Sequence, residues 1–203
     1  MSDINRRNML RILGAAPAAA VAFTWTTEEA VEAAQQSQQA RRQAAAANQA
    51  YKPRFFTDHE YATIVALADL ILPKDSRSGS ASEAGAPEFI DYIVAEQPDR
   101  QTAMRGGLGW LDAECRERFD KAFVNCVDAE RRQLLDDIAW PQKARAEMSH
   151  GVRFFNTTRD LVATGFWSSE IGVKDLGYIG NTAVAEWKGA PPEVLQKLGV
   201  SYE

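Results

Sequence analysis

Few residues in this 203-residue sequence could carry chemistry by themselves, and their types limit the reactions available. The sequence contains two histidines, His59 and His150, and two cysteines, Cys115 and Cys126. A zinc site of three histidines or of four cysteines is therefore excluded. Any reaction that the chain carries out alone must use carboxylates, hydroxyls or a bound cofactor.

Acidic side chains are the remaining candidates for general acid–base catalysis. A free-standing enzyme would use carboxylates such as Asp58, Glu60, Asp136 or Asp160. The adjacent acids at 136 and 137 fall on a predicted helix, where consecutive side chains point about 100° apart, so we interpret them as a solvated face. Both histidines fall in the first turn of a predicted helix, where exposure is the simpler interpretation. We keep the carboxylate enzyme as an alternative.

The sequence motifs that hold common cofactors are missing. The Gly-Gly-Leu-Gly run at 106–109 has the wrong spacing for a dinucleotide fold and falls in a predicted helix. The sequence has no Cys-x-x-Cys-His for covalent haem, no Gly-x-Ser-x-Gly nucleophile turn and no phosphate-binding loop. We therefore expect no cofactor in this chain.

The two cysteines, Cys115 and Cys126, are eleven residues apart. In a reducing compartment both would be buried thiols, whereas an oxidising compartment makes a disulfide plausible. A helix end, the connection at 120–125 and the start of the next helix could bring the two residues within reach of each other. An internal bridge is the favoured interpretation, while free buried thiols and a bridge to a partner subunit stay open.

The first 27 residues are similar to an export signal. The twin arginines Arg6 and Arg7 are followed, after one residue, by two apolar residues and Arg11, and an alanine-rich apolar stretch then covers 12–23. This order is typical of a twin-arginine signal, which exports proteins that have already folded. The apolar stretch is shorter than the ~20 residues that span a bilayer, so a permanent anchor is disfavoured. Residues 1–27 are therefore predicted to direct the chain to the periplasm, with cleavage left open.

The charge balance excludes general nucleic-acid binding. The formal net charge is -5, with 23 Lys and Arg against 28 Asp and Glu. After residue 50 the sequence holds 18 basic and 24 acidic residues, so the acidity lies behind the leader. An acidic body behind a basic leader is typical of an exported protein with protein partners.

Residues 28–54 are predicted to be a tether between leader and body. They are almost all Ala, Gln, Glu and Arg, which form helices well but include few large apolar side chains. Such a segment buries little surface by itself, so we expect a solvated helix or a disordered tether. The Lys-Pro pair at 52–53 ends the segment.

The body, residues 55–203, is predicted to be all-α with at least five helices. Apolar residues recur there at three- and four-residue spacing, and no stretch alternates long enough to require a strand. Capping residues and prolines mark the helix starts near residues 58, 87, 98, 128 and 149: Thr57 and Glu60 form a capping box, Pro87 and Pro98 open helices, and Asp128 and Ser149 are caps. Pro73 ends the first of these helices. The segment 74–85 is predicted to be a loop. An irregular, glycine-rich segment begins at Gly172, with one short helix at 193–198.

Several runs of the body, taken in order, resemble one known family. They are Phe-Phe-Thr-Asp-His-Glu-Tyr continuing to Ile-Leu-Pro (55–73), Ala-Pro-Glu-Phe-Ile-Asp (86–91), Phe-Phe-Asn-Thr-Thr-Arg-Asp-Leu-Val-Ala-Thr-Gly-Phe-Trp (154–167), Gly177-Tyr178-x-Gly180-Asn181, and Trp187. With the twin-arginine leader, this order resembles the gluconate 2-dehydrogenase subunit 3 family. These proteins are the small subunits of periplasmic, flavin-dependent sugar and sugar-acid dehydrogenases.

The resemblance implies a division of labour among subunits. A large subunit of the glucose-methanol-choline oxidoreductase type would hold FAD and oxidise the substrate, and a multi-haem c-type cytochrome would take the electrons. The small subunit would carry the export signal and stabilise the flavoprotein without catalytic residues of its own, as in complexes of the gluconate 2-dehydrogenase or glucoside 3-dehydrogenase type. A membrane-tethered helical adaptor for another exported partner stays open as an alternative.

Large side chains in the glycine-rich tail are the predicted partner interface. Trp167, Tyr178, Ile179 and Trp187 have few apolar neighbours in sequence with which to form a core of their own. Aromatic residues are frequent anchors of protein interfaces. The alternative is that these residues fill the core of this chain.

Overall fold

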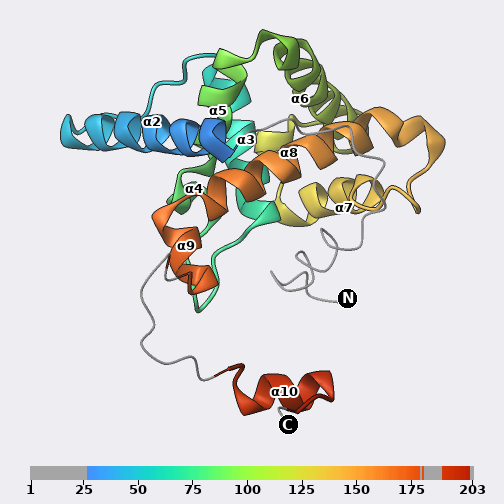
Figure 1. Ribbon diagram of the computed structural model, residues 1–203. Helices are drawn as coiled ribbons and strands as arrows, with labels where there is room; N and C mark the ends of the chain where they lie inside the picture. Colours follow the sequence, from blue (N-terminus) through green and yellow to red (C-terminus); the bar gives the residue numbers. More distant parts are fainter. Residues whose placement is uncertain (1–26, 179, 181–188, 202–203) are drawn as a thin grey trace.

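The computed structural model describes residues 27–178, 180 and 189–201, and these residues are helical with no strand among them (Figure 1). The prediction of an all-α fold is therefore confirmed. Two single 3-10 turns, η1 (Phe123–Asn125) and η2 (Ala146–Met148), lie between helices. The helices are α2 (Thr27–Ala46), α3 (Asp58–Ile71), α4 (Ala81–Ala84), α5 (Ala86–Glu96), α6 (Pro98–Phe119), α7 (Asp128–Ile138), α8 (Ser149–Trp167), α9 (Glu170–Leu176) and α10 (Pro192–Leu198).

Helix α8 is the centre of the fold. It contacts α3, α4, α5, α6, α7 and α9, and the ribbon shows it crossing the middle of the body (Figure 1). Its Leu161, Val162 and Phe166 are fully buried, together with Phe89 of α5 and Leu111 of α6. Burial of such side chains is the main favourable contribution to the fold, at roughly 1.5–3 kcal/mol for each.

Helix α3 begins and ends where the sequence predicts. Thr57 accepts a hydrogen bond from the Glu60 backbone, and the Glu60 side chain accepts one from the Thr57 backbone, which completes the predicted capping box. The helix ends at Ile71, shortly before Pro73. A proline cannot continue a helix without losing a backbone hydrogen bond.

The predicted loop at 74–85 contains a helix that the sequence did not reveal. Helix α4 is only four residues long and has its own capping box, formed by Ser80 and Glu83. The predicted caps Asp128 and Ser149 are also displaced by one position, because each is the first helical residue and Val127 or Met148 occupies the cap. The glycine-rich tail likewise contains α9, so it is less irregular than predicted.

Helix α2 lies in the segment predicted to be a tether. It is helical, as one of the two alternatives expected, but one of its faces is buried against the body instead of solvated. Ala33, Ala34 and Ser37 are buried, and the helix contacts α5 and α8. Small side chains let the backbones approach closely, so the helix packs without large apolar residues. Residues 27–46 therefore belong to the folded body.

None of the described helices is long and apolar enough to cross a membrane. The leader, with Arg6, Arg7 and the apolar stretch at 12–23, lies outside the described residues.

Candidate functional site

Asp91 is fully buried in α5 and organises the chain that enters α3. One carboxylate oxygen accepts hydrogen bonds from the Tyr51 hydroxyl at 2.8 Å and the Arg54 backbone N–H at 2.7 Å. The other oxygen accepts from the backbone N–H groups of Phe55 and Phe56 at 3.1 and 3.2 Å. With four donors around it, this carboxylate anchors the connection between α2 and α3.

Asp112, also a buried carboxylate, connects α6 to neighbouring segments by hydrogen bonds. Its Oδ1 accepts from the Phe123 backbone N–H at 2.9 Å, and its Oδ2 lies 2.6 Å from Nε2 of His59 and 3.4 Å from Arg116. His59 is about half exposed and bound to this carboxylate, so the interpretation of a simple exposed histidine was incomplete. The pair joins the first turn of α3 to α6.

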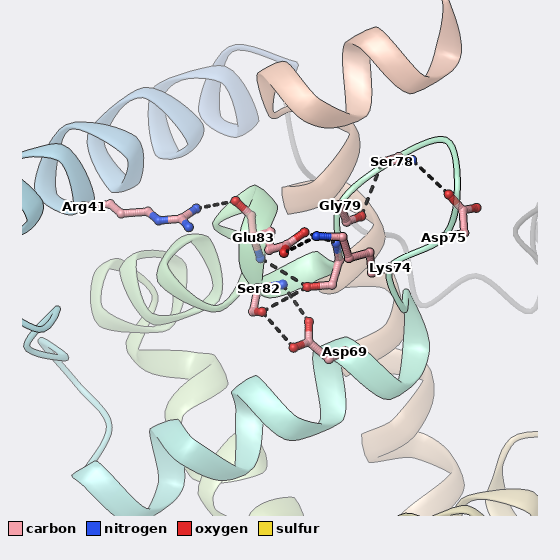
Figure 2. A network of polar contacts seen from close by, with 9 residues as sticks. Arg41, Asp69, Lys74, Asp75, Ser78, Gly79, Ser82 and Glu83 are labelled. Carbon is pink, nitrogen blue, oxygen red and sulfur yellow. Dashed lines mark hydrogen bonds and ion pairs between the residues drawn. The ribbon is translucent and has the colours of Figure 1, made fainter.

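A third network surrounds the loop before α4 (Figure 2). The Ser82 backbone N–H and hydroxyl donate to the two oxygens of Asp69, at 2.8 and 2.7 Å. Lys74 donates to Oε1 of Glu83 at 2.9 Å, and Arg41 of α2 donates to the Glu83 carbonyl oxygen at 2.7 Å. These contacts fasten α2, α3 and α4 to one another.

The carboxylates named as possible catalytic groups either form helix caps and ion pairs or are exposed to solvent. Glu60 caps α3 and lies 3.4 Å from Arg105, while Asp160 binds the neighbouring Arg159 at 3.0 Å. Asp58 and Asp136 are exposed on α3 and α7. Across the described ranges no group of three or more His, Cys, Asp or Glu side chains could hold a metal ion.

Glu88 is the buried acid with the clearest electrostatic cost. It lies near the start of α5, with Oε1 at 3.7 Å from Nε of Arg41. Burial is the largest effect and raises the pKa of Glu88 above its ordinary value, against the opposing influence of its own backbone N–H and of Arg41. The folded chain therefore binds a proton at Glu88 more readily than the unfolded chain does.

This raised pKa predicts a specific pH dependence. The contribution of Glu88 to stability is fully present below its ordinary pKa and is lost as the pH rises through the raised value. As the pH rises from 4 to 7, we expect the free energy of unfolding to fall less for Glu88→Gln, which cannot ionise, than for the parent chain. Urea unfolding at several pH values in that window measures this, and parallel pH profiles for the two proteins would contradict it.

Cys115 and Cys126 lie together in the core, both buried and in side-chain hydrogen-bond contact. The structure has both as free thiols, so the predicted bridge is not formed in it and stays a prediction for the oxidised protein. Burial, reinforced by Cys126, raises the pKa of Cys115 to about 12. Because the thiolate is the reactive form, Cys115 is expected to be inert in the native chain.

A thiol count tests the bridge. If it forms, chain isolated from the periplasm and unfolded without reductant should show no titratable thiol. Its reduction should then lower the free energy of unfolding by about 3 kcal/mol, the value for a loop of this length. Two thiols after unfolding would instead establish both cysteines as buried free thiols.

The predicted interface residues are divided by the structure. Trp167 packs edge-on against Phe166 at the end of α8, and its indole Nε1 is buried with no hydrogen-bond partner among the described residues. Tyr178 is 65% exposed. Ile179 and Trp187 lie outside the described residues. Trp167 therefore belongs partly to the core, and Tyr178 to the surface.

Leu176 belongs to the same surface and was missed by the sequence reasoning. It is 54% exposed at the end of α9, two residues before Tyr178. The available sequence signal was a large apolar residue directly before a glycine that could end a helix. In the structure Gly177 does end α9, in the left-handed conformation with φ 68°. We call Leu176 and Tyr178 the α9 patch.

The α9 patch is held by a tight turn between α8 and α9. A side chain at Gly172 would place its Cβ 2.0 Å from the Phe166 carbonyl oxygen, so only glycine fits there. Ser169 caps α9 by accepting from the Gly172 N–H at 3.0 Å. Arg77, from the loop before α4, donates to the Asp175 carbonyl oxygen at 2.9 Å. The turn and this cross-link fix the end of α9 relative to the body.

A comparison with known families decides how this assembly of helices is to be understood. The model of gluconate 2-dehydrogenase subunit 3 matches residues 58–186. The chain belongs to the gluconate 2-dehydrogenase subunit 3 family. No curated protein and no solved structure matches it.

Membership in the gluconate 2-dehydrogenase subunit 3 family confirms the resemblance seen in the sequence and implies a small subunit of such a dehydrogenase complex. The matched span covers α3 to α9 and includes the α9 patch, while α2 and α10 lie outside it. As a subunit 3, this chain has a catalytic subunit as its implied partner.

Proposed function

We propose that this chain is the non-catalytic small subunit of a periplasmic, FAD-dependent sugar or sugar-acid dehydrogenase. It carries the export signal and stabilises the flavoprotein subunit, which binds FAD and oxidises the substrate. Where a third subunit is present, it is a multi-haem cytochrome c that takes the electrons. The observation that carries this proposal is the family match over most of the folded body.

The use of acidic groups in this chain supports a non-catalytic role. Asp69, Asp91 and Asp112 each accept hydrogen bonds from backbone or hydroxyl donors of a distant segment. A general base needs a lone pair available to the substrate. The buried Asp91 and Asp112 and the half-buried Asp69 are thus engaged in holding connections between helices.

The α9 patch supports the binding role. Exposed apolar side chains in one place are typical of a surface that another protein covers. Leu176 and Tyr178 are such side chains, at the end of α9 and just beyond it. We propose that the flavoprotein covers the α9 patch.

Binding to the flavoprotein tests this function. We expect the chain to co-purify with the tagged catalytic subunit, and Tyr178→Ala to weaken the association roughly tenfold or more, as for an aromatic interface anchor. The melting temperature of the isolated variant should be unchanged, because Tyr178 is exposed. Val127→Ala, an exposed apolar position at the start of α7, is the matched control. A full-length chain that binds no flavoprotein would refute the proposal.

A further inference from the structure

Helix α10 is specified by its own sequence at both ends. Pro192 is its first residue, a position that suits the fixed φ of proline. At the other end Gly199 has φ 67°, its N–H donates to the Gln196 carbonyl oxygen at 3.2 Å, and the Val200 N–H donates to that of Leu195 at 3.1 Å. This pair of bonds is a complete glycine cap. The start and stop of the helix thus need no help from the body.

The apolar side of α10 is nevertheless uncovered. Val194, Leu195 and Leu198 fall within one arc of the helix, and the cap brings Val200 toward the same side. Val194, Leu198 and Val200 are 43%, 67% and 55% exposed, and no residue of the helix is buried. The helix lies apart from the body (Figure 1).

A helix of this length needs a surface to pack on. Isolated helices shorter than about 12–15 residues are marginal in water, because nucleation is costly. α10 has seven residues. Its caps define where it forms, but the free energy that keeps it formed must come from covering its apolar side.

The charges of α10 indicate what covers it. Glu193 lies in its first turn and Lys197 in its last, so each charge complements the helix dipole. The two charges together leave the helix with no net charge. A helix that lies on an anionic membrane carries several Lys or Arg on its polar side. Lys197 is the one basic residue between 189 and 201. The arrangement fits an apolar groove on a protein.

We propose that α10 is a docking helix that inserts Val194, Leu195 and Leu198 into an apolar groove on the flavoprotein subunit. This inference rests on the proposed function, which supplies the partner. α10 is near the α9 patch in sequence, because thirteen residues separate Tyr178 from Pro192. The body and the helix thus hold the partner at two places.

Helix α10 lies outside the residues that match the family. The match ends at residue 186, whereas α10 begins at Pro192. The proposed contact of α10 therefore adds to the contact that the matched body makes. A flavoprotein without a matching groove would bind the body alone and more weakly.

The test compares variants of the full chain by calorimetric titration against the purified flavoprotein. Leu198→Ala is expected to weaken binding by tenfold or more, with an unchanged melting temperature of the isolated chain. Gln196→Ala, an exposed polar position on the same helix, is the control and should bind as the parent does. Because the proposed contact of α10 is apolar, raising the salt concentration should change its contribution to flavoprotein affinity little.

Each other outcome overturns the inference. If the full chain binds and Leu198→Ala binds equally well, α10 does not dock, while the proposed function stands. If Leu198→Ala lowers the melting temperature, α10 packs on its own body. If it abolishes self-association measured by sedimentation and leaves flavoprotein binding intact, a second copy is the occupant. If the parent chain binds no flavoprotein, the proposed function fails and this inference with it.

Discussion

Replacing Asp91 with alanine is expected to lower the free energy of unfolding by roughly 4 kcal/mol, because several donors at a buried site lose their acceptor at once. The donors are the Tyr51 hydroxyl and the backbone N–H groups of Arg54, Phe55 and Phe56. The connection between α2 and α3 should loosen as a result. Urea unfolding followed by circular dichroism measures the loss.

Two further variants sharpen this prediction. Asp136→Ala, at an exposed position of α7, should change stability by no more than about 0.5 kcal/mol, the usual range for surface substitutions. Asp91→Asn keeps one acceptor oxygen and should fall between the two. Equal stability of Asp91→Ala and Asp136→Ala would show that the buried hydrogen bonds contribute little.

Replacing Arg6 and Arg7 with lysine is expected to leave both this chain and the flavoprotein in the cytoplasm. The substitution keeps the positive charge, so it tests recognition of the arginine pair and leaves the electrostatics of the leader unchanged. The flavoprotein is retained because, in the proposed division of labour, it has no signal of its own. Fractionation followed by immunoblotting of both subunits measures the result.

The control for export is Arg42→Lys, an exposed position on α2 beyond the predicted leader. It should leave both subunits in the periplasm. A flavoprotein that still reaches the periplasm with the lysine pair in place would contradict joint export. If this chain also arrives there, the leader uses another route.

The parts of the fold that sequence reasoning predicted are those encoded locally. The capping box at Thr57 and Glu60, followed by apolar residues at helical spacing, gave the bounds of α3 almost to the residue. The start of α6 at Pro98 followed in the same way. Both signals lie within a few residues of the structure that they specify.

The parts that were missed depend on distant contacts. The buried face of α2 consists of Ala33, Ala34 and Ser37, and such small residues give no hydrophobic periodicity. Asp91 meets partners 35 to 40 residues away, which no local pattern contains. The exposure of Leu176 likewise depends on what α9 packs against. The candidate surface could therefore be predicted only in part.

The docking of α2 has a consequence for the order of events during synthesis. α2 packs on α5 and α8, yet roughly 100 residues separate its end at Ala46 from the start of α8 at Ser149. At ~5–20 residues per second, the ribosome needs roughly 5–20 s to make that stretch. For this interval α2 lacks the α8 part of the surface that it packs on, although α5 is made earlier. A chaperone that holds the nascent chain therefore has a window of seconds in which the leader and α2 are both accessible, and this window closes when α8 emerges.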